Sequence, residues 1–167
     1  MIKHFPKIFF STILISFFLL GCENFDDDGI KNISLVPELG YDYDSLVTID
    51  SQDFFLEAYL WRDFMPISPP NGKPLISINW LISVDSSVIP KNIELKQQYV
   101  IYDDLVWISQ YENETHPTPD YKLERVSRNG PKWGPFVTVK VVAKITDTKT
   151  KKNYYLKLDS VRILRTD

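Results

Sequence analysis

Acid–base or nucleophilic catalysis needs titratable side chains held together, and this chain offers few. Beyond His4 it contains one histidine, His116, in a segment that continues with prolines at 117 and 119. A Ser-His-acid hydrolase needs its histidine fixed between nucleophile and carboxylate by rigid elements, which such a loop does not supply. We therefore expect that the protein is not an enzyme and uses no cofactor. We also expect no metal site, because a zinc site needs several His or Cys ligands.

Paired carboxylates are the other chemistry that the sequence offers. Asp103 with Asp104, and Glu112 with Glu114, could act as acid and base at a glycosidic bond. Both pairs lie in segments expected to be turns, where acids are common for reasons of solvation. A glycan-active hydrolase is therefore only an alternative to a binding protein without catalytic activity.

Two short segments combine residue types suited to binding. Residues 61–66 and 129–135 each contain a tryptophan, a cation and proline. Aromatic rings on proline-stiffened loops can stack on a sugar ring or anchor a partner's side chain. The alternative is that both indoles close one end of the core. The candidate binding residues are Trp61, Arg62, Phe64, Lys132 and Trp133.

The N-terminus predicts export and lipidation. Lys3 and Lys7 precede 13 apolar residues, 8–20, which is shorter than the roughly 20 that span a bilayer. The next residues complete Leu19-Leu20-Gly21-Cys22, which resembles the lipobox of bacterial lipoproteins, although Leu20 stands where a small residue is usual. The resemblance implies that residues 1–21 are removed and that Cys22 carries the lipid. The protein is then anchored in the outer membrane, facing the periplasm or the cell surface.

Charge and cysteine content limit the partners of the mature chain. Removal of residues 1–21 also removes Lys3 and Lys7. The mature chain then has 17 basic and 22 acidic residues, which gives a net charge of −5. Nucleic acid is excluded as a partner, since it requires a basic surface. Cys22 is the only cysteine, so its lipidation leaves no disulfide. The acidic run after it predicts a tether over 22–50, followed by a domain over 51–167.

Alternating apolar and polar residues predict the strands of that domain. In the segment 75–84, we expect Ile78, Trp80 and Ile82 to face the core, and in 136–146 we expect the same of Val139 and Val141. A short first strand is expected at 33–36. The main predicted strands are 51–61, 75–84, 93–102, 105–111, 121–126, 136–146 and 154–164.

About seven short strands without a helical segment favour an all-β fold, an antiparallel two-sheet sandwich. In pattern it resembles an immunoglobulin-like or fibronectin-like domain, with Trp80 in the place of a central buried tryptophan. A small β-barrel is the alternative. Asp44-Ser45-Leu46 also resembles a bacterial O-glycosylation signal, which makes Ser45 a candidate acceptor.

These observations favour a lipid-anchored, non-enzymatic binding or accessory module at the outer membrane. Its partner would be another envelope protein or an extracellular ligand. A carbohydrate-binding or glycan-processing lipoprotein is the alternative, because aromatic platforms also suit sugars.

Overall fold

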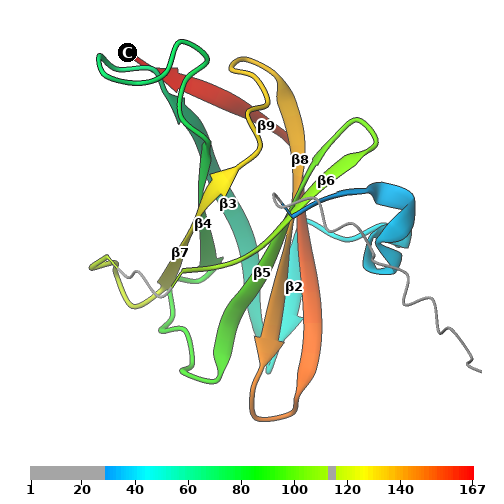
Figure 1. The fold of residues 1–167 in the computed structure, drawn as a ribbon. Helices are drawn as coiled ribbons and strands as arrows, with labels where there is room; N and C mark the ends of the chain where they lie inside the picture. Colours follow the sequence, from blue (N-terminus) through cyan, green and yellow to red (C-terminus); the bar gives the residue numbers. More distant parts are fainter. Residues whose placement is uncertain (1–28, 113–115) are drawn as a thin grey trace, which may run out of the picture.

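The computed structural model of the protein describes residues 29–112 and 116–167. The predicted signal peptide, the lipobox and Cys22 lie outside these residues. The fold is all-β, as predicted (Figure 1). Two single-turn 3-10 helices, η1 (Ile33–Leu35) and η2 (Pro37–Gly40), accompany the strands. The strands are β1 (Ile30–Asn32), β2 (Leu46–Ile49), β3 (Gln52–Asp63), β4 (Leu75–Ser83), β5 (Ile93–Tyr102), β6 (Leu105–Gln110), β7 (Lys122–Gly130), β8 (Thr138–Asp147) and β9 (Lys152–Thr166).

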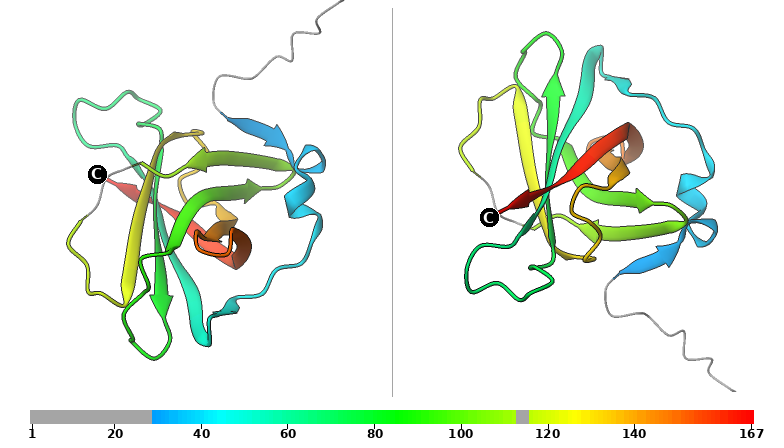
Figure 2. Two further views of the ribbon diagram at one scale, coloured as in Figure 1. Left: turned by 90° about the horizontal axis from the view of Figure 1, so that it is seen from below. Right: turned by 90° about the horizontal axis from the view of Figure 1, so that it is seen from above.

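The strands form one curled sheet in the order β1-β6-β5-β8-β9-β3-β4-β7, with β2 beside β3. The strands β6 and β7 approach each other as the sheet curls, and the backbone N–H of Glu112 donates to the carbonyl of Val126 at 2.9 Å. The domain is therefore partly barrel-like (Figure 2). One pair departs from the antiparallel prediction, since β3 and β9 run parallel where Leu60–Asp63 meet Ile163–Thr166.

The long strand β9 belongs to both halves of the sheet. Its first part pairs with β8 up to Arg162, and its last four residues pair with β3. Leu158 lies opposite Val141 and Val161 opposite Val139, so β9 has one extra residue in this stretch. Such a β-bulge bends the strand that carries it. The bend lets β9 pass from one half of the sheet to the other.

Residues 30–49 belong to the folded domain, so the prediction of a tether up to residue 50 was too long. Val36 and Ile49 are buried in hydrophobic clusters. Residues 33–35 form a 3-10 helix where a strand was expected, and the side chain of Asn32 caps it by accepting from the backbone N–H of Ser34. The chain then runs along the outside of β8 and β9 before it enters β2 (Figure 2).

The sequence predicts which residues of the segments 75–84 and 136–146 face the core. The structure confirms this prediction for the second segment only. Val139 and Val141 are buried, as expected. In β4, however, Ser77, Asn79 and Ser83 face the interior and are almost fully buried. Ile78 and Trp80 are half-buried on the outer face, and Ile82, although buried, shares that face. The predicted orientation of β4 was therefore wrong.

Hydrogen bonds explain why the polar face of β4 can point inward. The Oε1 atom of Gln98 accepts from Ser77 Oγ at 2.9 Å and from Asn79 Nδ2 at 2.5 Å. The amide of Gln98 in turn donates to Ser109, and Asn79 Nδ2 also lies 3.1 Å from the hydroxyl of Tyr111. Buried polar groups are tolerated when they are paired in this way. Among the described residues, Asn79 Oδ1 is the one atom of this cluster that has no hydrogen-bond partner. This network links β4 to β5 and β6 through the core.

Candidate binding surfaces

Arg62, one of the five predicted binding residues, is buried and fastens two loops together. It follows the core residue Leu60 by two positions on β3, so the alternation of the strand turns it inward. Its guanidinium donates to the carbonyl groups of Asn71 and Lys73 in one loop and of Lys132 and Gly134 in the other. Burial lowers the pKa of Arg62. With its donors used by the backbone, this side chain has a structural role.

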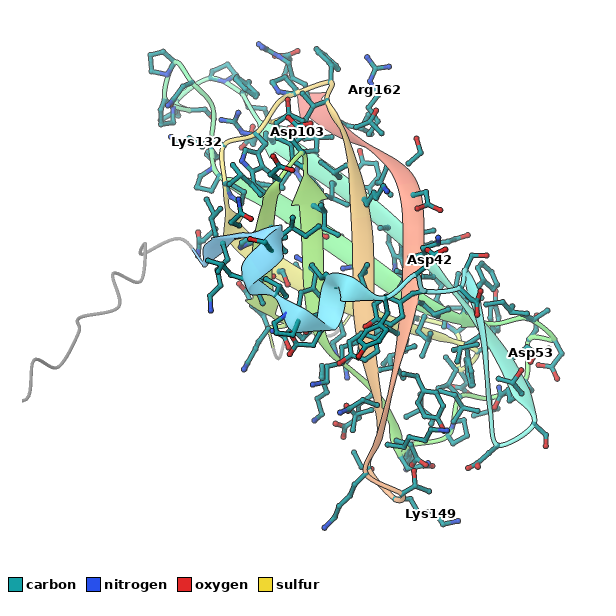
Figure 3. All side chains as sticks on the ribbon, turned by 90° about the vertical axis from the view of Figure 1, so that its right-hand side faces the viewer. Asp42, Asp53, Asp103, Lys132, Lys149 and Arg162 are labelled. Carbon is teal, nitrogen blue, oxygen red and sulfur yellow. The ribbon has the colours of Figure 1, made fainter. Side chains whose placement is uncertain are left out.

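The two predicted loops lie at the same end of the domain. Figure 3 shows Lys132 at the end opposite Lys149. Lys132 Nζ donates to Asn71 Oδ1 at 3.0 Å, which links the loops a second time. Trp133 is half-buried, packs against the core and lies with its ring 5.6 Å from that of Tyr102. The guanidinium of Arg165 lies over the ring of Phe64, with its Cζ atom 4.2 Å from the ring centroid. Trp133 thus helps to close the end of the core.

Trp61 lies apart from this loop junction, on the outer face of the sheet. It is half-buried, and its ring centroid lies 5.4 Å from that of Tyr59, a residue that is 41% exposed. Across the ladder, Tyr59 pairs with Ile78 and Trp61 with Ile76. We call this surface the aromatic face; it consists of Phe55, Tyr59, Trp61, Ile76, Ile78 and Trp80.

Polar side chains hold Trp80 in place on the aromatic face. Its indole N–H donates to Glu124 Oε2 at 2.5 Å, and Lys122 Nζ lies 4.4 Å from the ring centroid. Glu124 Oε1 is 2.6 Å from Nδ1 of His116, and Lys122 also pairs with Glu57 at 3.3 Å. Sequence reasoning missed this arrangement because it placed Trp80 inside the core. The alternation of apolar and polar residues in β4 shows which residues share a face of the strand. It does not show which of the two faces is buried.

A groove of about 480 Å³ borders the aromatic face, between β3 and β9. Its lining includes the apolar residues Leu56, Ala58 and Leu158 and the aromatic residues Tyr59 and Trp80. The polar residues along it are Glu57, Ser160 and Arg162. The groove can therefore offer aromatic, hydrogen-bonding and charged contacts to one ligand.

A second hollow, of about 410 Å³, lies where the N-terminal segment crosses the outside of β8 and β9. Tyr43 stacks on Tyr155 with the ring centroids 4.7 Å apart. Lys157 Nζ lies 2.6 Å from Asp42, and this contact lowers the pKa of Asp42 and raises the pKa of Lys157. These contacts are made within the chain, so they attach the N-terminal segment to the sheet.

The remaining sequence predictions fall at exposed places. His116 lies on the surface beside Glu124, and Ser45 is exposed immediately before β2. Within residues 29–112 and 116–167, no group of three or more His, Cys, Asp or Glu side chains is arranged to hold a metal ion. The same residues include no helix with the length and apolar character needed to cross a membrane.

Comparisons with known proteins do not add to this description. A scan against protein-family models and searches of the curated proteins and of the solved structures each found no match to this chain. Its function must therefore be inferred from its own surfaces.

Proposed function

We propose that this protein is a non-enzymatic binding module, anchored by a lipid at Cys22 to the bacterial outer membrane, and that the aromatic face binds its partner. An immunoglobulin-like sandwich, with β9 shared between the two halves of the sheet, is the architecture that we propose for it. The carrying observation is the orientation of β4, which directs Ile76, Ile78 and Trp80 outward and buries Ser77 and Asn79 instead. Contiguous apolar patches on a protein surface commonly mark interaction sites.

The side chains of the aromatic face support this role. Tyr and Trp are enriched where binding energy is concentrated, because they combine a large apolar surface with a polar group. The contacts of Trp80 with Glu124 and Lys122 fix its ring before any partner arrives. A fixed ring loses little side-chain entropy on binding.

Affinity isolation from solubilised membranes tests this face. The full-length protein should co-purify with specific envelope proteins, and Tyr59→Ala combined with Ile78→Ser should lose them. The matched control is Leu105→Ala, which changes an exposed apolar residue on β6. Equal recovery of the same proteins by the face variant and the parent would count against the proposal.

The lipid anchor is tested separately at Cys22. Cells grown with labelled fatty acid should label the parent protein, whereas Cys22→Ser should be unlabelled and either released from the membrane or left uncut. A Cys22→Ser protein that is labelled, processed and retained like the parent would contradict the anchor.

A carbohydrate ligand is the second candidate, and the groove beside β9 favours it. Tyr59 and Trp80 offer rings on which a sugar can stack, and Glu57, Ser160 and Arg162 can hydrogen-bond to hydroxyl groups. A panel of bacterial and host polysaccharides should then raise the melting temperature of the parent but not of Tyr59→Ala. No shift with any of them, together with recovery of protein partners, would favour the first candidate.

A further inference from the structure

Residues 29–44 lie across the outer face of the sheet, and we call them the strap (Figure 2). The strap includes β1, η1 and η2 and ends just before β2. It pairs with β6 only over the three residues of β1. In the described part of the chain, three more backbone hydrogen bonds attach it to the sheet and its turns. They run from Ile108 N–H to the Gly29 carbonyl (3.0 Å), from Ile33 N–H to the Asp104 carbonyl (2.8 Å) and from Lys157 N–H to the Asp44 carbonyl (3.1 Å).

The side chains of the strap pack on a cluster that is separate from the main core. Val36 is the only buried residue of the strap, and it contacts a cluster that includes Tyr99 and Val142. The neighbour of Val142 on β8, Val141, belongs to the main cluster instead. Successive side chains of a strand point to opposite faces of the sheet. Loss of the strap would therefore uncover the outer face and leave the main core closed.

Hollows on both sides of the strap show that its packing is incomplete. One, of about 410 Å³, is lined by Ile33, Leu39 and residues 41–43 of the strap. The other, of about 420 Å³, is lined by residues 35–38. Protein interiors are normally packed without such voids. Regions with few buried apolar contacts open locally at a lower free energy than the whole domain.

The place of the strap in the chain gives its opening a consequence. Seven residues, 22–28, connect the proposed lipid anchor at Cys22 to the strap. At 3.3–3.6 Å for each residue, they reach at most about 25 Å. Release of the strap adds sixteen residues to this connection, which lengthens it by up to about 55 Å.

We propose that the strap is released from the sheet as a unit and that its release extends the reach of the anchored domain toward its partner. The following strand β2 stays in place, because Ile49 belongs to the main core and Val47 packs against it. A partner that holds the domain farther from the membrane than the docked strap allows favours the released form, since it binds that form better. This inference rests on the proposed function and adds its regulation.

Hydrogen exchange followed by NMR on the full-length protein tests release as a unit. The amides of Ile33, Ile108 and Lys157 each bond to, or belong to, the strap. They should exchange at rates within about threefold of one another, after correction for sequence effects, and at least tenfold faster than the amides of the central strand β8. Exchange as slow as that of β8 would show that the strap opens only with the whole domain and would overturn the proposal.

A variant at one end of the strap shows whether its two ends are coupled. Tyr43 stacks on Tyr155, and Tyr43→Ala removes this contact close to Asp44. If the strap opens as a unit, the variant should speed exchange at least threefold at the distant Ile108 as well as at Lys157. The matched control is Tyr59→Ala on the aromatic face, which should change neither rate. A change confined to Lys157, or no change at all, would contradict release as a unit.

The register of β1 and β6 allows the strap to be locked. The hydrogen bond between Gly29 and Ile108 and the alternation of an antiparallel ladder make Asn32 and Leu105 a pair without mutual hydrogen bonds. The Cα atoms of such a pair lie about 4.5 Å apart, within the range that a disulfide spans. Asn32→Cys with Leu105→Cys should therefore form a disulfide in the oxidising cell envelope. Exchange at Ile108 should be at least tenfold slower in the oxidised than in the reduced variant, and equal rates would overturn the proposal.

The same lock tests whether release extends the reach of the domain. In affinity isolation from membranes, the locked variant should recover at least threefold less of the envelope proteins than Leu105→Cys, which cannot form the disulfide. Sixteen Gly and Ser residues inserted between Asp28 and Gly29 of the locked variant restore the length of a released strap, and they should restore recovery. Recovery that is unaffected by the lock, or not restored by the insertion, would overturn this role.

These outcomes differ from a failure of the proposed function. If the locked variant recovers the envelope proteins like its control, while Tyr59→Ala/Ile78→Ser loses them, the aromatic face binds and release of the strap is not needed. If neither the locked variant nor the aromatic-face variant loses any envelope protein, the proposed function fails as well.

Discussion

Arg62 Nη1 donates to the carbonyl oxygen of Gly134 at 2.7 Å, across 72 positions of sequence. The same guanidinium holds the carbonyl groups of Asn71, Lys73 and Lys132. A planar group with five donors suits this task, because it can satisfy carbonyls that point toward it from two different loops. The positions of both loops therefore depend on one buried cation.

Replacing Arg62 with Lys should destabilise the protein although the charge is kept. A lysine ammonium lacks the fork of donors, so at least two of the carbonyls lose their partner, and we expect a loss of about 2–4 kcal/mol in the free energy of unfolding. Urea denaturation followed by tryptophan fluorescence measures this. Arg162→Lys, at an exposed position, should change stability by less than about 0.5 kcal/mol. A similarly small change at Arg62 would contradict its structural role.

Because Trp80 of β4 faces outward and Leu81 faces the core, truncating these two adjacent residues should destabilise the protein by different amounts. Trp80 is half-buried on the outer face, so Trp80→Ala should cost about 1–2 kcal/mol, below the roughly 3–5 kcal/mol of a buried tryptophan. Leu81 is fully buried, so Leu81→Ala should lower the free energy of unfolding by about 2–5 kcal/mol. Thermal or urea unfolding of both variants compares them. If Trp80→Ala is the more damaging variant, β4 has the opposite orientation.

The strands themselves could be predicted because alternation is a local property. The strand 93–102 was predicted with the bounds that the structure has, and the turn at Asp103 joins β5 and β6 as expected. The tether was misjudged because residues 30–49 contain few periodic signals. Their structure depends on contacts made far along the chain, such as Ile33 N–H with the carbonyl of Asp104.

The candidate site could be predicted only in part. Trp61 stays a candidate, half-buried on the outer face of the sheet, whereas Arg62 and Trp133 support the loops and the core. The aromatic face was missed because Ile78 and Trp80 follow the general rule that apolar residues are buried. The partners that let Ser77 and Asn79 point inward, above all Gln98, lie on another strand, and the local pattern does not show them.

The polar network in the core should behave as a unit. Gln98→Leu removes the acceptor of Ser77 and Asn79 and the donor to Ser109, so about 2–4 kcal/mol of stability should be lost. Asn79→Leu should cost a similar amount. Because the two side chains contact each other, the double variant should lose less than the sum of the two single losses. A double-mutant cycle in urea measures this difference, and strict additivity would show that the network is not coupled.

Asp147 should make the stability of the protein depend on acid pH. Its carboxylate accepts from Thr150, Asn92 and the backbone of Lys149, and these bonds lower its pKa from 3.8 to about 2. A carboxyl group with a lowered pKa in the folded state binds protons more readily when unfolded. Its contribution is therefore complete above pH 3.8 and is lost as the pH falls toward 2.

Asp147→Asn should therefore be less stable than the parent at pH 7, and the difference should shrink as the pH falls through this window. An asparagine keeps one acceptor for Asn92 or Thr150 but loses the charge that strengthens those hydrogen bonds. Urea midpoints measured at several pH values between neutrality and pH 2 check this. Asp104→Asn, in the exposed turn between β5 and β6, serves as the control and should run parallel to the parent. A difference between Asp147→Asn and the parent that stays constant, or grows toward low pH, would show that these hydrogen bonds do not favour the ionised form.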